Sequence, residues 1–217
     1  MKDKIQVLDK GFVSLVDSMG SDLSIVNSAR VSFGKRTEKM RPRDKKLIKY
    51  LWEHKHSSPF RHASLQFHIK APIFVLRQWM KHQVGCSWNE ASGRYIEFEG
   101  DFYHPETYRL QSSDNKQGSY GQIPRQDQAK TIYETSMTYA LRDYTRLLEL
   151  GVCKEQARMV LPLSLYTECY WTCSLQALMH FLALREDSHS QWEIQEYARA
   201  VRELVKELFP VSLNLNQ

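Results

Sequence analysis

Residues 77–95 have the sequence Arg-Gln-Trp-Met-Lys-His-Gln-Val-Gly-Cys-Ser-Trp-Asn-Glu-Ala-Ser-Gly-Arg-Tyr, which concentrates basic, amide and hydroxyl side chains and one carboxylate in a short span. Such a mixture packs poorly in a core and is well suited to bind anions. The apolar residues around its start have helical spacing, so we predict a short helix that leads into an irregular loop carrying Arg77, Gln78, Lys81 and His82. A solvated basic loop after a core helix is an alternative that composition leaves open.

Two periodicities alternate along the rest of the chain, and together they predict an α+β fold. Leu65, Phe67 and Ile69 alternate with polar residues, which is typical of a half-buried strand. Apolar residues between 133 and 148 recur with helical spacing up to Gly151, a residue type that commonly follows a helix. By the same criteria we expect strands at 5–8, 11–16 and 95–98, and helices at 23–29, 42–54, 154–160, 175–182 and 194–208.

Three further patterns concern the second half of the chain. Residues 165–173 are rich in aromatic and β-branched residues and suit either a strand or a buried helix. Residues 99–126 are polar and rich in turn formers, which predicts a long surface loop or a lid. Ser190 and Glu193 have the spacing of a capping box at the start of the last helix.

Length and composition predict a single domain over residues 1–217. A chain of this length buries a sizeable core, and its 42% hydrophobic and 25% charged residues are ordinary for a globular protein. The net charge of +5 comes from scattered residues, so it nominates no partner. Four cysteines without a C-x-x-C pair favour reduced thiols and a cytoplasmic location, and no apolar run is long enough to predict a membrane span.

The second half of the 77–95 segment resembles the signature of the flavin-dependent thymidylate synthases, in which Asn-Glu, one residue, Ser, one residue and Arg follow an Arg-His-Arg triplet. Asn89, Glu90, Ser92 and Arg94 match this pattern. The triplet is replaced by residues 81–83, Lys-His-Gln, and one extra residue precedes Ser87. Similarity to the family extends in the same order through residues 28–33, 56–62, 70–75, 157–162 and 184–193.

The resemblance implies an enzyme that makes thymidylate from dUMP. It implies FAD as the cofactor, NADPH as the reductant and 5,10-methylenetetrahydrofolate as the one-carbon donor. It further implies helices packed around one mixed or antiparallel sheet, and a homotetramer whose sites are shared between subunits. In this family no cysteine nucleophile is used, and none of the four cysteines here is followed by histidine.

Arg185 matches the family arginine that polarises the pyrimidine and is the candidate catalytic residue. A guanidinium stays charged and offers a planar fork to the edge of the base, where it would stabilise the anion that develops when N3 loses its proton. The alternative is a structural arginine that pairs with Glu186 or Asp187 at the end of a helix.

The resemblance also implies residues that hold the nucleotide and the flavin. The positions that match dUMP contacts are Gln78, Lys81, Glu90, Ala91, Ser92, Gly93, Arg94, Arg158 and Arg185. Those that match FAD contacts are Ser58, Lys81, His82, Gln83, Glu90, Ser174, Leu175, Gln176 and His180. Lys81, Gln83 and His180 depart from the common family residues, so we expect the flavin diphosphate to be held differently or less tightly.

His56 resembles a family histidine near the flavin and the folate, and Tyr95 could stack on a pteridine or a base. Several nearby histidines raise the question of a metal, but their positions after a helix and along a strand send them to different faces, so we expect no metal site. Nor do we expect nucleic acid or a membrane as partners. The competing functions are an RNA- or DNA-binding protein that uses the basic 77–109 region, and a degenerate flavoprotein of the same fold.

Overall fold

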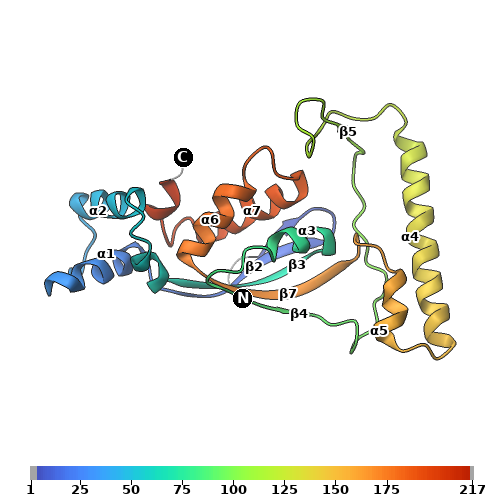
Figure 1. The fold of residues 1–217 in the computed structure, drawn as a ribbon, viewed down its shortest axis with the longest axis horizontal. Helices are drawn as coiled ribbons and strands as arrows, with labels where there is room; N and C mark the ends of the chain where they lie inside the picture. The colour runs from blue at the N-terminus through green and yellow to red at the C-terminus, as the bar shows by residue number, and fades with distance from the viewer. Residues whose placement is uncertain (1–3, 216–217) are drawn as a thin grey trace.

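The computed structural model describes residues 4–215 and is built around a five-stranded antiparallel sheet (Figure 1). The strands lie in the order β1-β2-β3-β7-β4. The antiparallel alternative of the sequence prediction is therefore confirmed. Their bounds are Lys4–Val7 for β1, Gly11–Met19 for β2, Ser64–Pro72 for β3, Cys86–Glu90 for β4 and Tyr166–Ser174 for β7.

Strand β3 lies at the centre of the sheet and shows why its sequence alternates. Leu65, Phe67 and Ile69 are buried on one face, while Gln66, His68 and the other polar residues between them lie on the opposite face. Phe67 stacks on Trp171 of β7 with ring centroids 5.4 Å apart. The buried apolar residues of β3 and Trp171 belong to one continuous hydrophobic core.

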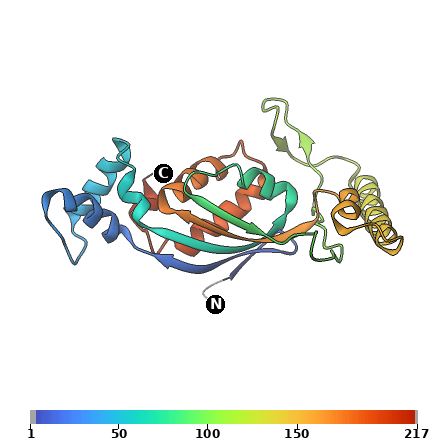
Figure 2. The same cartoon turned by 60° about the horizontal axis from the view of Figure 1, so that its bottom comes forward.

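Helices α3, α6 and α7 cover the apolar face of the sheet (Figure 2). Helix α7 buries Ile194, Tyr197, Ala198 and Val201 along one stripe, as its helical spacing predicts. The bounds are Ile73–Trp79 for α3, Leu175–Arg185 for α6 and Trp192–Val205 for α7.

Four more helices flank the sheet at its two ends (Figure 1). Helices α1 and α2 lie together at one end, and α4 and α5 lie together at the other. Their bounds are Asp22–Arg30, Pro42–Glu53, Gln126–Glu149 and Lys154–Ala157. Short 3₁₀ turns lie at Val31–Phe33, Ser58–His62, Arg158–Val160 and Ser212–Asn214.

The structure decides three of the uncertain segments. Residues 166–174 form a strand because they pair on both sides, with β3 and with β4. The irregular loop expected to carry Arg77, Gln78, Lys81 and His82 begins later than predicted, because Arg77 and Gln78 lie in α3. It is also only partly irregular, since residues 86–90 form the edge strand β4. The strand expected at 95–98 is wrong: the chain turns there, with Tyr95 N donating to Ser92 O at 2.9 Å.

Residues 99–126 form the expected long connection, with little regular structure. Two short strands of two residues each, β5 at Leu110–Gln111 and β6 at Ser119–Tyr120, pair as an antiparallel hairpin. Phe102 is buried and forms a single bridge with Leu165, which fixes the start of the connection. Within residues 4–215, no helix is both long and apolar enough to span a bilayer.

Candidate active site

Arg185 is the last residue of α6 and is held by two residues at the end of α3. Arg185 Nε donates a hydrogen bond to His82 Nε2 at 3.0 Å, and Nη2 donates to the backbone oxygen of Gln78 at 3.0 Å. Helix α6 itself is capped at its N-terminus by Ser174, whose hydroxyl accepts a hydrogen bond from Ala177 N. The fold therefore brings together three residues that the sequence nominated.

The electrostatics of this group keep one cation beside a neutral imidazole. Burial, followed by the charges of Arg185 and His180, lowers the pKa of His82 to about 4. Burial also lowers the pKa of Arg185, but a guanidinium stays protonated at neutral pH. Among the described residues, Arg185 Nη1 has no hydrogen-bond partner. The group thus presents a fixed positive charge with a donor available to a ligand.

A chain of side chains continues from Gln78 into the protein. Gln78 Nε2 donates to Gln191 Oε1 at 2.5 Å, and Gln191 Nε2 donates to Glu193 Oε2 at 2.9 Å. Glu193 is 3% exposed and is neutralised by Arg109, whose Nη2 lies 2.7 Å from Glu193 Oε1. The amide of Gln78 is therefore oriented by a buried ion pair.

Sequence reasoning missed the role of Glu193. The capping box expected for Ser190 and Glu193 is wrong: Gln191 occupies the N-cap position, and the Ser190 hydroxyl donates instead to Leu184 O at 2.7 Å. A usable signal was present, because Glu193, Tyr197 and Val201 are four residues apart and therefore share the buried face of α7. A carboxylate on such a face needs a charged partner.

A second group of nominated residues lies where β4 ends. Glu90, Ala91, Gly93 and Arg158 line one cavity of about 460 Å³. Partial burial raises the pKa of Glu90, and the charge of Arg158 opposes this rise. A cavity with an arginine and a less readily ionised carboxyl group can accept a polar ligand that carries negative charge.

The turn after β4 explains two positions of the motif. A Cβ on Gly93 would lie 2.4 Å from the Phe98 ring and 3.1 Å from Arg158 Cδ, so a larger residue would displace one of them. Ser92 Oγ accepts a hydrogen bond from Arg94 N at 3.3 Å, and the Arg94 guanidinium lies 5.5 Å from the centroid of the Tyr95 ring. The side chains of Arg94 and Tyr95 are exposed.

Two of the residues nominated for flavin, Gln176 and His180, line a third cavity, of about 600 Å³. It lies beside the end of α2, and the Trp52 ring stands 5.5 Å from His180. Gln176 Oε1 accepts a hydrogen bond from Arg61 Nε at 2.6 Å. An indole face together with amide and imidazole groups fits the flat, polar-edged ring of a flavin.

The other residues nominated for flavin surround these cavities less closely. Ser58 is exposed and follows Ser57, which lines the cavity beside α2. Lys81 and Gln83 are exposed on the turn after α3, where they are accessible to a ligand. The Leu175 side chain is fully buried, so only its backbone could touch a cofactor.

A single chain does not bring all nominated residues together. His56 follows α2, whereas the backbone oxygen of Tyr95 accepts a hydrogen bond from Lys154 at the start of α5. These helices lie at opposite ends of the sheet (Figures 1 and 2). Among residues 4–215, no hydrogen bond or ion pair connects the group at Arg185 with the cavity at Arg158.

Three of the cysteines, Cys86, Cys169 and Cys173, are poorly suited to nucleophilic chemistry. Burial raises the pKa of Cys86 and Cys173, and it raises the pKa of Cys169 to about 12. A nucleophilic cysteine requires a lowered pKa, so these three thiols are not activated. In the part of the chain that the structure describes, no three His, Cys, Asp or Glu side chains are grouped as metal ligands would be.

Comparison with known proteins assigns the family. Residues 14–211 match the family model described as thymidylate synthase complementing protein. The chain belongs to the flavin-dependent thymidylate synthases. It is 50% identical over 208 residues to a flavin-dependent thymidylate synthase of Thermus thermophilus, covering 96% of this chain and 76% of the relative. For the enzyme of Thermosipho melanesiensis the identity is 48% over 209 residues, covering 95% and 90%.

A solved structure agrees with this assignment. The UMP/dUMP methylase PolB from Streptomyces cacaoi, bound with 5-Br dUMP, superposes with a TM-score of 0.86 at 36% identity and covers 97% of this chain and 96% of its own. The flavin-dependent synthase is a methyltransferase, so the enzymatic interpretation is favoured over a nucleic-acid-binding protein.

Proposed function

We propose that this flavin-dependent thymidylate synthase uses FAD, with NADPH as the reductant and 5,10-methylenetetrahydrofolate as the one-carbon donor, to convert dUMP to dTMP. In the balanced reaction, C5 of the uracil loses its proton and gains the methylene carbon, tetrahydrofolate is released, and one hydride reduces the resulting methylene adduct to the methyl group of dTMP. The bound flavin would supply that hydride. The observation that carries the proposal is the guanidinium of Arg185, held by Gln78 and His82 with one nitrogen left to a ligand.

The role of Arg185 follows from its surroundings. Neutral uracil is a weak nucleophile at C5, and loss of the N3 proton strengthens it. A cation held beside N3 and O2 stabilises the resulting anion, and partial burial strengthens this effect because less water screens the charge. His82 contributes by accepting from Nε without adding a second positive charge.

The dUMP phosphate would be held at the cavity where β4 ends. Ser92, Gly93 and Arg94 offer a hydroxyl, a backbone N–H and a guanidinium, and Arg158 lies against Gly93. These are the donors that bind phosphate most strongly. The same proposal gives Ala91 a backbone contact with the nucleotide, and it gives Glu90 a contact with a sugar hydroxyl or a flavin group. Gln78 and Lys81 would approach the nucleotide from the side of Arg185.

The nominated residues occupy separate parts of one chain, and this supports a site shared between subunits. We propose a homotetramer in which the Arg185 group of one subunit faces the β4 cavity of another. The same arrangement would bring His56 and Tyr95 of different subunits toward the folate and the flavin. FAD would lie against Gln176 and His180 in the cavity beside α2, with Ser58, Ser174 and the backbone of Leu175 around it.

The diphosphate of FAD would meet an altered set of side chains. Lys81, His82 and Gln83 replace the family triplet, which leaves one permanent charge where two arginines are common. Lysine retains a point charge but lacks the bidentate fork of arginine. This supports weaker binding of the cofactor, with Glu90 as a further contact at the edge of the flavin.

One assay tests the proposal. The purified protein is expected to be yellow, with a flavin absorption band near about 450 nm. With dUMP tritiated at C5, it is expected to release tritium only when methylenetetrahydrofolate is present together with reduced flavin, which NADPH supplies. A protein that stays colourless after incubation with FAD and removal of the excess, or tritium release that is independent of the folate, would contradict it. NADPH oxidation without release would support the degenerate flavoprotein instead.

A further inference from the structure

A cavity of about 670 Å³ lies at the N-terminal end of α2, away from the residues discussed above. Four of its lining side chains are cationic and none is acidic, and Glu38, the one acidic residue of loop 34–41, does not line it. The lining residues are Arg30, Phe33, Gly34, Lys35, Arg36, Arg43 and Leu47.

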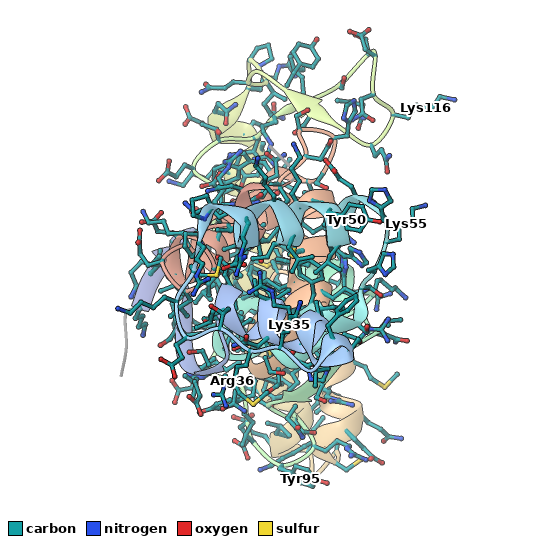
Figure 3. The ribbon with its side chains drawn as sticks, turned by 90° about the vertical axis from the view of Figure 1, so that its left-hand side faces the viewer. Lys35, Arg36, Tyr50, Lys55, Tyr95 and Lys116 are labelled. Atoms are coloured by element: carbon teal, nitrogen blue, oxygen red, sulfur yellow. The ribbon has the colours of Figure 1, made fainter. Side chains whose placement is uncertain are left out.

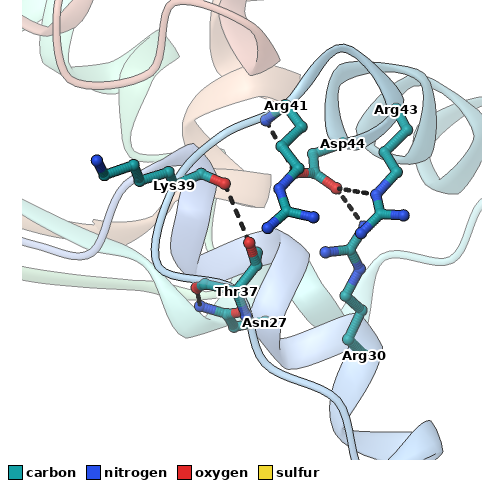
Figure 4. Close-up of polar contacts among 7 residues, drawn as sticks. All are labelled: Asn27, Arg30, Thr37, Lys39, Arg41, Arg43 and Asp44. Atoms are coloured by element: carbon teal, nitrogen blue, oxygen red, sulfur yellow. Dashed lines mark hydrogen bonds and ion pairs between the residues drawn. The ribbon is translucent and has the colours of Figure 1, made fainter.

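A buried carboxylate, Asp44, holds two of the cations that line the basic cavity, Arg30 and Arg43 (Figure 4). Asp44 is fully buried, pairs with Arg30 and accepts a hydrogen bond from Arg41 N at 2.9 Å. Arg43 Nε lies 4.0 Å from the same carboxylate. This one negative charge pairs with two of the four cations that line the cavity, so the cavity keeps an excess of positive charge.

The loop that carries the remaining cations is fixed in place. Asn27 Nδ2 donates to Thr37 O at 3.0 Å, and Thr37 N donates to Asn27 Oδ1 at 2.9 Å (Figure 4). Lys35 and Arg36 directly precede Thr37 in the sequence, and they lie at the end of the molecule that faces the viewer in Figure 3. Their side chains are exposed and have no ion-pair or hydrogen-bond partner within residues 4–215.

An aromatic ring completes the basic cavity. Phe33 is 77% exposed although it lines a cavity rich in cations. An exposed aromatic ring beside Arg and Lys is the combination that proteins use to stack a base and hold its phosphate. The cavity therefore suits a phosphorylated nucleotide better than a simple anion.

Helix α2 connects the basic cavity to the cavity proposed for flavin. Arg43 and Leu47 line the first, and Leu51 lines the second. These residues are four apart and so share one face of the helix. The 12 residues of α2 span roughly 18 Å at 1.5 Å per residue, which is comparable with an extended dinucleotide.

We propose that the basic cavity binds the adenosine 2′-phosphate end of NADPH, with the nicotinamide directed along α2 toward the flavin. Phe33 stacks on the adenine, and Lys35 and Arg36 bind the 2′-phosphate. This inference rests on the proposed function, because it assumes that a flavin in the cavity beside α2 receives the hydride.

The test compares two reductants that differ only in the 2′-phosphate. The FAD-loaded double variant Lys35→Ser/Arg36→Ser is mixed with NADPH or NADH, and the rate of flavin reduction is followed against reductant concentration. We expect the half-saturating NADPH concentration to rise about tenfold or more, while the value for NADH stays within about twofold, since a charge-assisted contact is worth at least a factor of ten. The matched control is Lys45→Ser/Lys46→Ser, two exposed cations on α2 outside the cavity.

Three results would overturn the proposal. The first is an equal change for both reductants, and the second is no change for either. The third is a double variant that binds polyglutamylated folate more weakly but binds monoglutamylated folate and NADPH normally. This result would assign the cations to the polycarboxylate tail of the folate. A further experiment distinguishes failure of this proposal from failure of the proposed function by reducing the flavin with dithionite in place of NADPH. With dUMP and methylenetetrahydrofolate, the reduced double variant should then release tritium at the normal rate. Absence of release from the reduced wild type would contradict the proposed function and would say nothing about where NADPH binds.

Discussion

At the scale of single residues, the contact between Arg185 and His82 carries most of the proposed chemistry. His82 can accept the hydrogen bond from Arg185 only while its Nε2 is unprotonated. Its surroundings enforce this state, because burial first, and then the electrostatic influence of Arg185 and His180, lower its pKa to about 4. The same feature makes the folded protein sensitive to acid.

Stability is expected to fall with pH across the range that separates the two pKa values of His82. The unfolded chain binds this proton below about pH 6.5 and the folded chain only below about 4, so the stabilisation is complete above 6.5 and is lost as the pH falls toward 4. Because His82 is only half-buried, we expect a loss of about 1–2 kcal/mol rather than the full value of the shift. Urea unfolding at pH 7 and pH 4.5 measures it, and the variant His82→Gln should show a smaller loss; an equal loss would contradict this assignment.

At the scale of elements, the sequence predicted most helices and strands because their packing is expressed in a local period. The alternation in 64–72 and the stripe in α7 are both confirmed. The strand predicted at residues 95–98 does not form because a strand also needs a partner. Strand β4 already occupies the edge of the sheet before the chain turns at Ser92. A local pattern carries no information about whether that partner exists.

The first turn of α7 gives a prediction at this scale. Replacing Glu193 by Gln leaves Arg109 partly buried without its counter-charge, so the free energy of unfolding should fall by about 3 kcal/mol. Thermal unfolding followed by circular dichroism measures this loss. The control is Glu196→Gln, which removes a more exposed ion pair with Arg199 on the same helix and should cost less than about 1 kcal/mol. Equal losses in the two variants would remove the structural role assigned to Glu193.

At the scale of the whole molecule, family motifs nominated the residues but not their arrangement. The sequence identified Gln78, His82 and Arg185, and the structure places them in contact. It could not identify the buried pair of Glu193 with Arg109, because these residues are far apart along the chain. Nor could it find the basic cavity, since the scattered cations gather only when loop 34–41 folds against α1.

A shared active site predicts complementation between inactive subunits. Arg185→Ala and Arg94→Ala remove groups from the two separate halves of the proposed site, so each homotetramer should be inactive. When the two variants are unfolded together and refolded, about a quarter of the sites should combine two intact halves if subunits mix at random. Recovery of about that fraction of tritium release is expected. No recovery, in mixtures whose mixed assembly is verified by native mass spectrometry, would place both groups in one subunit's site.

The central claim is that a fixed guanidinium at position 185 activates the pyrimidine, and the most direct measurement is tritium release from C5-labelled dUMP by the FAD-loaded variant Arg185→Ala. Arg199→Ala, which removes an exposed arginine from α7, is the matched control. We expect Arg185→Ala to keep its flavin absorbance and its reduction by NADPH while tritium release falls by about 100-fold or more, as for loss of one electrostatic stabiliser of a transition state, and we expect Arg199→Ala to remain active. Release by Arg185→Ala at the wild-type rate would contradict the account.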